Sequence, residues 1–473
     1  MKQVTLPQGP ADPRPGGSPP ARILIAGGGY VGMYAALRLQ RRLHRGEAEI
    51  TVVEPQPYMT YQPFLPEAAA GSIDPRHVIV PLRRVLHGCT VVTGEITRLD
   101  HAARQAQAAT PATRSTGDPD LKLPYDLLVA APGSVSRTLP IPGLAEHGIG
   151  FKTVEEAVAL RNHVLEQLDI ASSTRDPAIR EAALTFVFVG GGFAGVEALA
   201  ELEDMARAAV RYYHNVTAED LRWILVEATD RILPEVGPEL GRYTVSELRG
   251  RNIEVRLGTR LESLTDRIVV LSDGSRFAAR TLVWTAGVRP APVLAATDLP
   301  TDARGRIRCE PTLRVAGVDD AWSAGDCAAV PDLTRPGEYC APNAQHAVRQ
   351  AKVLGDNVLA QLRGEPQTPY RHSSRGAVAS LGLHKGVAQV RGRRLTGRPA
   401  WLMHRAYHLS RMPTFNRKAR VLADWMLAGV SSREIVSLGS LEHPRAEFEA
   451  AMGRGTPTAE PRSQPEPPTR PGS

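Results

Sequence analysis

Two short apolar runs, each followed at once by a glycine-rich turn and then by positions with helical spacing, dominate the pattern of this chain. The runs are residues 23–26 and 185–189. Their unbroken apolar character is typical of strands buried on both faces of a parallel sheet. The pattern therefore predicts two strand–turn–helix units, each the opening part of a doubly wound α/β domain.

Both turns have the glycine spacing of a dinucleotide fingerprint. In this motif the first glycine allows the tight turn, the second lets the backbone approach a pyrophosphate, and the third packs helix on strand. Each turn is also followed by a later apolar run that ends in a carboxylate, Glu54 or Glu227, which can accept both ribose hydroxyls of an adenosine. The sequence thus predicts two dinucleotide sites. The residues assigned to the turns are Gly27, Gly28, Gly29, Tyr30, Val31 and Gly32 in the first and Gly190, Gly192, Phe193 and Gly195 in the second.

Three later segments distinguish the two sites. A strand over residues 125–130 leads to Ala131 and Gly133, a strand of small residues ends at Gly325 and Asp326, and a helix opens at Ala344. These segments resemble the flavin side of the two-dinucleotide flavoprotein reductases, in which the aspartate hydrogen-bonds the flavin ribityl chain. The resemblance implies an α/β fold with two Rossmann-like domains. The implied boundaries are an FAD domain at 21–148 and 288–370 and an NAD domain at 149–287, inserted in the FAD domain.

Composition agrees with a globular chain of two or three domains. Of the 473 residues, 42% are hydrophobic and 23% are charged. No apolar run approaches the roughly 20 residues needed to cross a bilayer. Residues 1–20, 102–120 and 453–473 are predicted to be disordered, and the first of these lacks the apolar stretch of a signal peptide. Composition alone favours the cytoplasm.

The four cysteines argue against disulfide chemistry. Cys89, Cys309, Cys327 and Cys340 form no CxxC pair, and no cysteine precedes Cys89, where a redox pair beside the flavin would be expected. A sulfide:quinone oxidoreductase would need a second cysteine at a suitable distance from Cys340, and none is present. We interpret the four as small buried hydrophobic residues.

The C-terminal region, residues 371–452, is strongly basic and amphipathic. The formal net charge of the chain is +7, yet residues 371–433 carry thirteen lysines and arginines against one carboxylate, Asp424. Around Trp401 and Trp425, apolar residues alternate with basic ones on each side of a break at Pro413. Such helices are typical of an anionic lipid surface. The alternative is that their apolar faces pack on the FAD domain. No DNA- or RNA-binding signature accompanies the charges, so nucleic acid is disfavoured.

A pair of histidines in this region, His404 and His408, has the i, i+4 spacing of metal ligands. No carboxylate accompanies them in the sequence, and three arginines are close by. We therefore predict no metal site.

Five segments together give a more specific resemblance: residues 61–71, 283–288 (with Ala286 and Gly287), 344–347, 379–382 and 397–401. They resemble the type II NADH dehydrogenases, the non-proton-pumping NADH:quinone oxidoreductases, over about residues 21–440. The resemblance implies FAD and NADH as cofactors and a membrane quinone as acceptor. It also implies a peripheral enzyme on the cytoplasmic face of the cell membrane, anchored by C-terminal helices and often a homodimer.

The resemblance also implies roles for individual residues. NADH would dock on the second turn, with Glu227 on its ribose and Glu197 at the contact between flavin and nicotinamide. The helix that opens at Ala344 would point its positive end at the flavin, and quinone would react near Gln345 and Arg375.

One position departs from the family pattern. Where relatives carry a second glutamine on the quinone-side helix, this chain has Arg349, followed by Gln350. One helical step turns a side chain by about 100°, so Gln350 is not a simple replacement. Arg349 would attract a quinone carbonyl, unless it pairs with a neighbouring carboxylate.

Two other functions fit the same motifs. One is a soluble NADH-dependent reductase of a small redox protein such as ferredoxin or rubredoxin, since an acidic ferredoxin would also bind a basic surface. The other is a flavoprotein that acts as an NADH-responsive sensor. The basic C-terminal region favours the quinone reductase over both.

Overall fold

The computed structural model describes residues 19–372, 376–431 and 435–437. All helices and strands given below belong to one compact unit, Met1–Ile435. The predictions of disorder for residues 1–20 and 453–473 fall outside the described residues, apart from Pro19 and Pro20.

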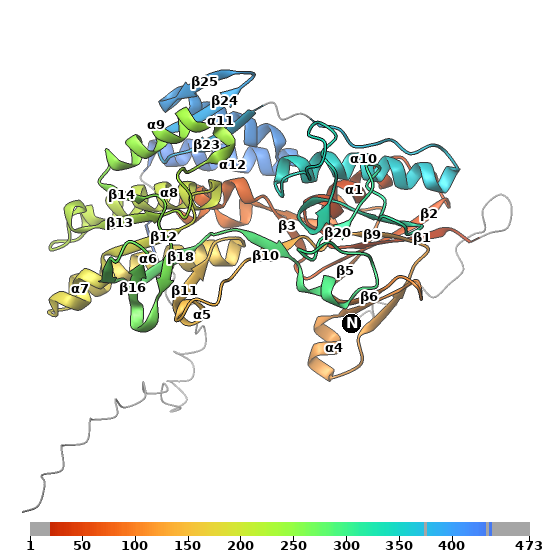
Figure 1. Cartoon of the computed structure of the whole chain (residues 1–473), viewed down its shortest axis with the longest axis horizontal. Coiled ribbons are helices and arrows are strands. Elements are labelled where there is room, and N and C mark those ends of the chain that lie inside the picture. The colour runs from red at the N-terminus through yellow and green to blue at the C-terminus, as the bar shows by residue number, and fades with distance from the viewer. Residues whose placement is uncertain (1–18, 373–375, 432–434, 438–473) are drawn as a thin grey trace, which may run out of the picture. The chain divides into compact units, whose positions relative to one another are not determined.

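The first glycine turn follows the central strand of a five-stranded parallel sheet, on the right of Figure 1. From edge to edge the strands are β21 (Ala321–Ser323), β9 (Leu127–Ala130), β1 (Ala21–Ala26), β2 (Ala48–Glu54) and β5 (Thr90–Thr93). Helices α1 (Tyr30–Gln40) and α10 (Ala344–Arg363) lie side by side in both views and are joined by the Arg38–Asp356 ion pair of 2.8 Å. Segments from both ends of the chain therefore build this sheet.

The second glycine turn follows a strand of a second parallel sheet, on the left of Figure 1. Its strands are β11 (Gly148–Gly150), β18 (Thr281–Trp284), β12 (Thr185–Val189), β13 (Arg222–Val226) and β14 (Ile253–Arg256). The helices of this part are α6 (Val154–Ser173), α7 (Pro177–Ala183), α8 (Phe193–Ala209) and α9 (Pro238–Arg249). The prediction of two parallel-sheet Rossmann-like units is confirmed.

An antiparallel sheet of three strands occupies the segment in which disorder was expected, so that prediction for residues 102–120 is wrong. The elements are β6 (Glu95–Asp100), β7 (Gln105–Ala109), α4 (Pro111–Thr116) and β8 (Leu121–Pro124). Ala106 and Ala108 of β7 are buried in the core of the first sheet, and Thr110 caps α4. The apolar alternation consists only of alanines, which hides a strand among turn-forming residues.

A sheet that the sequence did not predict opens the C-terminal region. Its elements are β23 (Gly376–Ser380), β24 (Gly386–Val390) and β25 (Arg393–Thr396), followed by α11 (Gly397–Arg411) and α12 (Phe415–Val430). The predicted break at Pro413 is confirmed. Arg251, which is buried, donates to the carbonyls of Leu381 (2.6 Å) and Ala200 (2.9 Å) and so ties this sheet to α8. None of the described helices is long and apolar enough to cross a bilayer.

Short elements connect these parts. They are β3 (Tyr58–Thr60), η1 (Gln62–Phe64), α2 (Leu65–Ala69), η2 (Pro75–His77), β4 (Ile79–Pro81), α3 (Leu82–Val85), β10 (Ser134–Ser136), α5 (Leu144–His147), η3 (Val210–Tyr212), η4 (Ala218–Asp220), η5 (Pro234–Val236), β15 (Leu261–Ser263), η6 (Thr265–Arg267), β16 (Ile268–Leu271), β17 (Arg276–Ala278), β19 (Val288–Pro290), η7 (Pro292–Ala296), β20 (Ile307–Arg308), η8 (Gly325–Cys327) and β22 (Ala328–Ala329).

Candidate functional site

The first turn closes tightly over the carboxyl end of the first sheet. Gly27 has a φ of 109°, and a Cβ there would come 2.2 Å from the carbonyl oxygen of Ala131, so only glycine fits. Glu54, the last residue of β2, accepts a hydrogen bond of 2.5 Å from the backbone N–H of Gly28. Burial raises the pKa of Glu54 to about 6, although the backbone hydrogen bonds oppose the shift. The carboxylate predicted to hold an adenosine ribose therefore lies beside the turn.

Residues from three separate segments meet around this first turn, and we call the assembly the first cradle. Ala131 and Gly133 follow β9, and Gly325 and Asp326 follow β21. The backbone N–H of Gly325 donates to the buried Gln350 side chain at 2.8 Å.

The first cradle has the properties expected of a flavin dinucleotide site. The hydroxyl of Tyr30 is buried and has no hydrogen-bond partner among the described residues. Space is open beside Gly29 and Gly133, where a Cβ would meet no atom within 4 Å. An unpartnered buried polar group and open space beside glycine backbone fit a bound dinucleotide.

The second turn repeats this arrangement on the second sheet. Gly190 has a φ of 117°, and a Cβ there would crowd Thr285. Glu227 accepts from the N–H of Gly191 at 2.6 Å and from the N–H and hydroxyl of Thr229 at 2.7 and 2.8 Å. Of the other residues predicted to bind a cofactor, Gly192, Phe193 and Gly195 lie at the start of α8, while Ala286 and Gly287 follow β18. We call this assembly of the second turn, Glu227 and the residues after β18 the second cradle, and it repeats the glycine turn and the paired carboxylate of the first.

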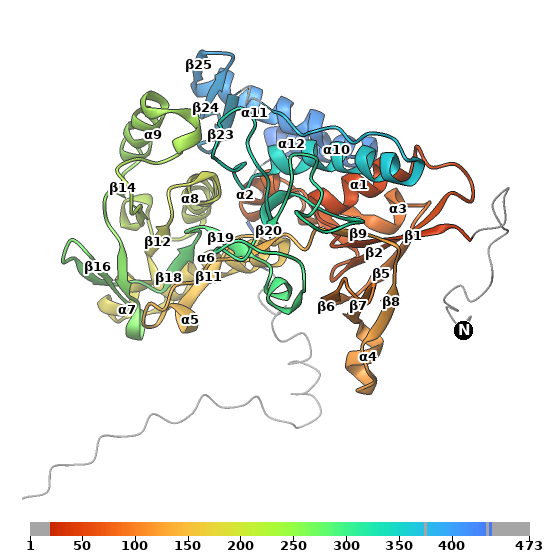
Figure 2. The same ribbon diagram turned by 45° about the vertical axis from the view of Figure 1, so that its right-hand side comes forward.

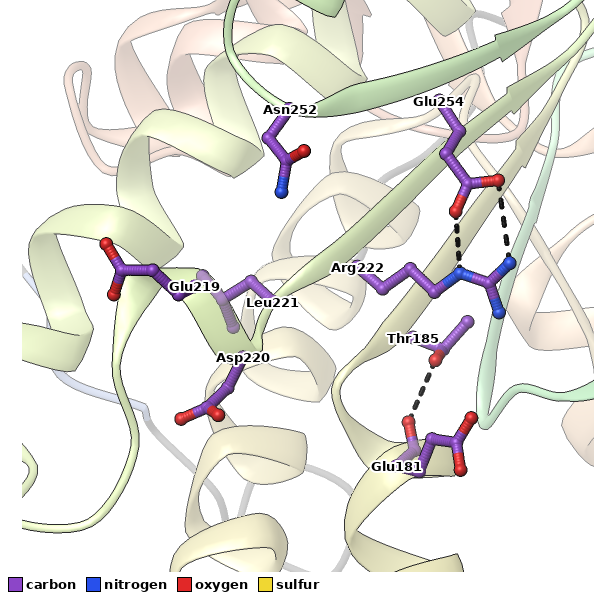
Figure 3. Close-up of a pocket in the computed structure, with 8 residues that line it drawn as sticks. All are labelled: Glu181, Thr185, Glu219, Asp220, Leu221, Arg222, Asn252 and Glu254. Carbon is purple, nitrogen blue, oxygen red and sulfur yellow. Dashed lines mark hydrogen bonds and ion pairs between the residues drawn. The ribbon is translucent and has the colours of Figure 1, made fainter.

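A surface pocket of about 320 Å³ (Figure 3) lies at the end of the second sheet opposite the second glycine turn. It is formed at the amino ends of β12, β13 and β14, and Arg222 in it pairs with Glu254 at 2.7 Å. Ligands of parallel α/β sheets bind at the carboxyl ends of the strands. This pocket is therefore separate from the second cradle.

Glu197 lies beyond the first turn of α8, although its position in the sequence, close after the second glycine turn, suggests the first turn of that helix. The helix begins at Phe193, so Glu197 is its fifth residue, is buried, and is not part of the first turn. Its Oε1 accepts from the backbone N–H of Ser380 at 2.8 Å and lies 3.1 Å from Nε2 of His404. The side chain joins the NAD-side helix to both β23 and α11.

The two histidines of α11 contact carboxylate and hydroxyl groups. Burial alone would lower the pKa of His404, but the hydrogen bond and charge of Glu197, with Glu67 and Glu201 nearby, raise it above its usual value. Burial and the neighbouring His404 hold the pKa of His408 well below its usual value, and its Nδ1 lies 3.3 Å from the Tyr61 hydroxyl. The expectation that no carboxylate accompanies these histidines is therefore wrong. The described residues contain no group of three or more side chains arranged as metal ligands.

A second buried carboxylate fastens α11 and α12 to α2. Glu67 accepts from Arg405 at 2.8 Å and from the indole N–H of Trp425 at 2.7 Å. The Arg405 guanidinium lies between the rings of Trp401 and Trp425, 4.1 and 4.7 Å from their centroids. Burial raises the pKa of Glu67, and the charge of Arg405 opposes the shift. Trp401 is buried and Trp425 is half-buried, so both tryptophans pack at least in part on the protein, as the alternative interpretation of this region predicts.

Other apolar side chains of α11 and α12 point outward. Five large ones are 58% to 93% exposed: Leu402, Phe415, Met426, Leu427 and Val430. One set of apolar residues in this region therefore packs on the protein, and another set faces solvent.

The residues predicted to serve the acceptor lie on the first turns of α10. Asn343 caps this helix by accepting from the N–H of His346 at 2.9 Å, next to Ala344. Gln345 donates to the Gly376 carbonyl at 3.3 Å, and Arg349 donates to the Gln345 carbonyl at 2.9 Å. No carboxylate of the described residues forms an ion pair with Arg349. Arg375 lies outside the described residues.

All four cysteines are free, and burial raises the pKa of each thiol. Cys309, Cys327 and Cys340 are buried as predicted, whereas Cys89 is only half-buried. None has the lowered pKa of a reactive thiolate.

Several residues of the site were missed by sequence reasoning. Ser134 donates to Asp326 and Ser380 donates to Glu197, while Lys152 and Glu67 contact Ser134 and Arg405, and the fold brings each of these pairs together. Glu67 and Ser380 lie within segments that carried the family resemblance, which was the one available signal.

Comparison with known proteins gives concordant matches. The chain matches the pyridine nucleotide-disulphide oxidoreductase family over residues 21–351. A type II NADH:quinone oxidoreductase of Staphylococcus aureus is 30% identical over 388 residues, covering 81% of this chain and 92% of the relative. The structure of NDH2 from Plasmodium falciparum in complex with NADH superposes with a TM-score of 0.80 at 17% identity, covering 88% and 99% of the two chains. A ferredoxin reductase from Rhodopseudomonas palustris superposes with a TM-score of 0.60 at 23% identity, covering 78% and 82%.

Proposed function

Because the chain belongs to the pyridine nucleotide-disulphide oxidoreductase family and, within it, to the type II NADH:quinone oxidoreductases, we propose that it works at an anionic membrane surface with the residue roles given below. The chain is an FAD-dependent enzyme that oxidises NADH and reduces a quinone. When bound, the flavin accepts two electrons from NADH and passes them to the quinone, and this chemistry belongs to the cofactor. The protein supplies binding, alignment and charge.

The first cradle binds FAD and the second binds NADH in this proposal. Glu54 and Glu227 accept the ribose hydroxyls of the two adenosines, and Asp326 accepts from the ribityl chain. The two glutamates are already held beside their glycine turns, Glu54 by the N–H of Gly28 and Glu227 by the N–H of Gly191. This limits the reorganisation needed on binding. We retain the domain boundaries proposed from the sequence, with the NAD domain at 149–287.

Quinone reduction takes place beside the first turns of α10. Gln345 and Arg349 offer an amide and a permanent cation there, and both can donate to a quinone carbonyl as negative charge develops on it. Arg349 forms no ion pair with a carboxylate of the described residues, which supports this role because its charge remains available to a substrate. Glu197 lies at the contact between nicotinamide and flavin.

The observation that carries the membrane proposal is the exposed apolar set on α11 and α12. Basic side chains flank it, among them Arg411, Lys418 and Arg420. Apolar side chains that enter the acyl boundary, with basic ones at the headgroups, are the arrangement of an interfacial helix. Each cation adds about 1 kcal/mol near an anionic surface and is screened by salt. In this proposal, the anionic lipid surface to which the protein binds is the cytoplasmic face of the cell membrane.

Flotation with vesicles tests the membrane proposal. We expect the full-length protein to float with vesicles of anionic lipid at low salt, and less with zwitterionic vesicles or at high salt. The double substitution Met426→Glu and Val430→Glu should abolish flotation while leaving flavin binding unchanged. Tyr212→Glu, at an exposed aromatic residue of the NAD side, is the matched control. Unchanged flotation of the double variant would contradict the proposal.

Turnover with a short-chain quinone, compared with ferredoxin as acceptor, tests the choice of substrate. We expect rapid turnover with the quinone only. Preference for ferredoxin would support the soluble reductase, and negligible turnover with both would support a sensor.

A further inference from the structure

A lysine that no motif includes extends into the first cradle. Lys152 lies between β11 and α6, and its backbone is fixed on both sides. Its N–H donates to Glu156 at 2.6 Å, and its carbonyl accepts from Gln62 at 3.3 Å. The position of the side chain therefore follows from a well-held backbone.

The Lys152 side chain is connected to the predicted ribityl ligand by one hydroxyl. Its Nζ donates to the Ser134 hydroxyl at 2.7 Å, and that hydroxyl donates to Asp326 at 2.7 Å. No carboxylate oxygen among the described residues lies within 4.0 Å of Nζ, so the ammonium is not part of a direct ion pair. A hydrogen-bonded chain of this kind orients each member and leaves two N–H groups of the ammonium for another partner.

Partial burial of the Lys152 ammonium strengthens its electrostatic effect on neighbouring groups. Asp326, which the Lys152 ammonium reaches through Ser134, also lies near the buried Tyr30 hydroxyl. Burial lowers the pKa of Lys152, while Asp326 and Glu156 oppose the shift. A positive charge in a partly desolvated site acts over a longer range than one in water. The half-buried ammonium therefore adds positive potential to the space that fits the flavin.

We propose that Lys152 is a positioning charge that makes the bound flavin easier to reduce. Two-electron reduction of a flavin leaves it with one more negative charge when a single proton is taken up, and a fixed ammonium stabilises that form more than the neutral oxidised form. The effect requires a differential interaction with the two forms. The proposal rests on flavin occupying the first cradle, and is independent of the quinone and membrane proposals.

A purely structural role for Lys152 would have a different signature. If the ammonium only held Asp326 in place, its loss would weaken oxidised and reduced flavin equally and leave the reduction potential unchanged. Ser134 separates the two roles, because Ser134→Ala breaks the hydrogen-bonded chain but keeps the charge.

The test is the reduction potential of FAD bound to the full-length holoenzyme, measured by anaerobic titration without quinone or lipid. We expect Lys152→Met to weaken reduced relative to oxidised flavin at least tenfold, which corresponds to a fall of about 30 mV for two electrons. Lys152→Gln, which keeps an amide donor without the charge, should fall similarly. Lys152→Arg and Ser134→Ala should stay close to the wild type, as should Lys122→Met on the exposed face of β8.

Two outcomes would overturn the proposal. One is an unchanged potential in both neutral variants, and the other is an equal fall in Lys152→Gln and Ser134→Ala. If Lys152→Met fails to retain flavin, the comparison of Lys152→Gln with Lys152→Arg still decides. Quinone turnover is not used, so a failure of the acceptor assignment would not affect the result.

Discussion

Nε2 of His404 lies 3.1 Å from Oε1 of Glu197, and both side chains are buried. The first residue comes from α11 and the second from α8, so a single contact joins the C-terminal helices to the helix that follows the second glycine turn. The Ser380 N–H donates to the same carboxylate oxygen. The contact therefore holds α11 against α8 through two groups that can each change charge with pH.

Stability should depend on pH through this contact. Because the pKa of His404 is raised in the folded protein, the stabilisation is complete below the unfolded value of about 6.5 and is lost as pH rises through the folded value. We expect His404→Gln to lower the free energy of unfolding by about 2 kcal/mol at pH 6 and by less at pH 9. Urea unfolding at both pH values measures this. His44→Gln, at an exposed histidine, is the control, and a difference independent of pH would contradict the prediction.

Binding of FAD should weaken in mild acid. Glu54 must be ionised to accept two ribose hydroxyls, and its pKa is about 6. We expect the dissociation constant of FAD from the apoprotein to rise below pH 6, approaching tenfold per pH unit. Glu54→Gln should bind FAD more weakly at pH 8 and with a flatter pH dependence. Glu49→Gln, on the same strand with its side chain exposed, should behave as the wild type. Parallel curves for Glu54→Gln and the wild type would refute this role for the carboxylate.

The enzyme should prefer NADH to NADPH. Glu227 would repel a 2′-phosphate and lose its ribose hydrogen bond. We expect Glu227→Ala to lower kcat/KM for NADH about tenfold to a hundredfold, since hydrogen bonds to charged groups contribute about 1.5–3 kcal/mol. The value for NADPH should change much less. Glu219→Ala, in the pocket at the opposite edge of the sheet, is the control. Equal kcat/KM for the two nucleotides in the wild-type enzyme would exclude the assignment.

Substitutions on α10 should separate the two half-reactions. We expect Gln345→Ala and Arg349→Gln to leave the reduction of bound flavin by NADH unchanged and to slow its reoxidation by quinone. The reason is that both side chains lie on the first turns of α10, where quinone is proposed to react, whereas NADH is proposed to bind at the glycine turn that precedes α8. Stopped-flow absorbance measures each step. Lys352→Gln, exposed on the same helix, is the control, and unchanged reoxidation in both variants would move the acceptor site elsewhere.

Removal of Arg405 should be costly unless Glu67 is changed with it. Arg405→Met leaves a buried carboxylate without its cation, and breaking a buried pair on one side costs about 3–5 kcal/mol. We expect the double variant Glu67→Gln, Arg405→Met to recover part of this loss in a double-mutant cycle of unfolding free energies. Arg398→Met, exposed on the same helix, should be neutral. Additive effects of the two substitutions would contradict a direct interaction.

The predictions from the sequence were correct where a short segment carries its own geometry. Gly27 and Gly190 were identified because a turn with positive φ before a helix leaves few alternatives to glycine. Glu54 and Glu227 were identified because each is the carboxylate that ends the apolar run after its glycine turn. Asp326 was assigned to the FAD site only through the family resemblance. It follows β21 of the first sheet, and the whole second sheet lies between β9 and β21 in the sequence.

What the sequence missed depends on contacts between distant segments. His404 and Glu197 are separated by most of the second half of the chain, and no local pattern marks them as partners. Trp401 and Trp425 have the helical spacing of a lipid-facing surface, but the Glu67 carboxylate draws the indole of Trp425 inward. Periodicity gives the apolar face of a helix and does not say what that face meets.

Because β21 of the first sheet is synthesised after all the strands of the second sheet, the first sheet can be completed only after the second has been made. β9 is synthesised long before β21, its neighbour at the edge of the sheet, while all five strands of the second sheet lie between Gly148 and Trp284. On the ribosome the second sheet can therefore close while the first still has an open edge of leucine, valine and alanine. We expect a nascent chain that ends between residues 285 and 320 to have a complete second sheet and an unpaired edge at β9, an arrangement that favours aggregation unless a chaperone covers that edge.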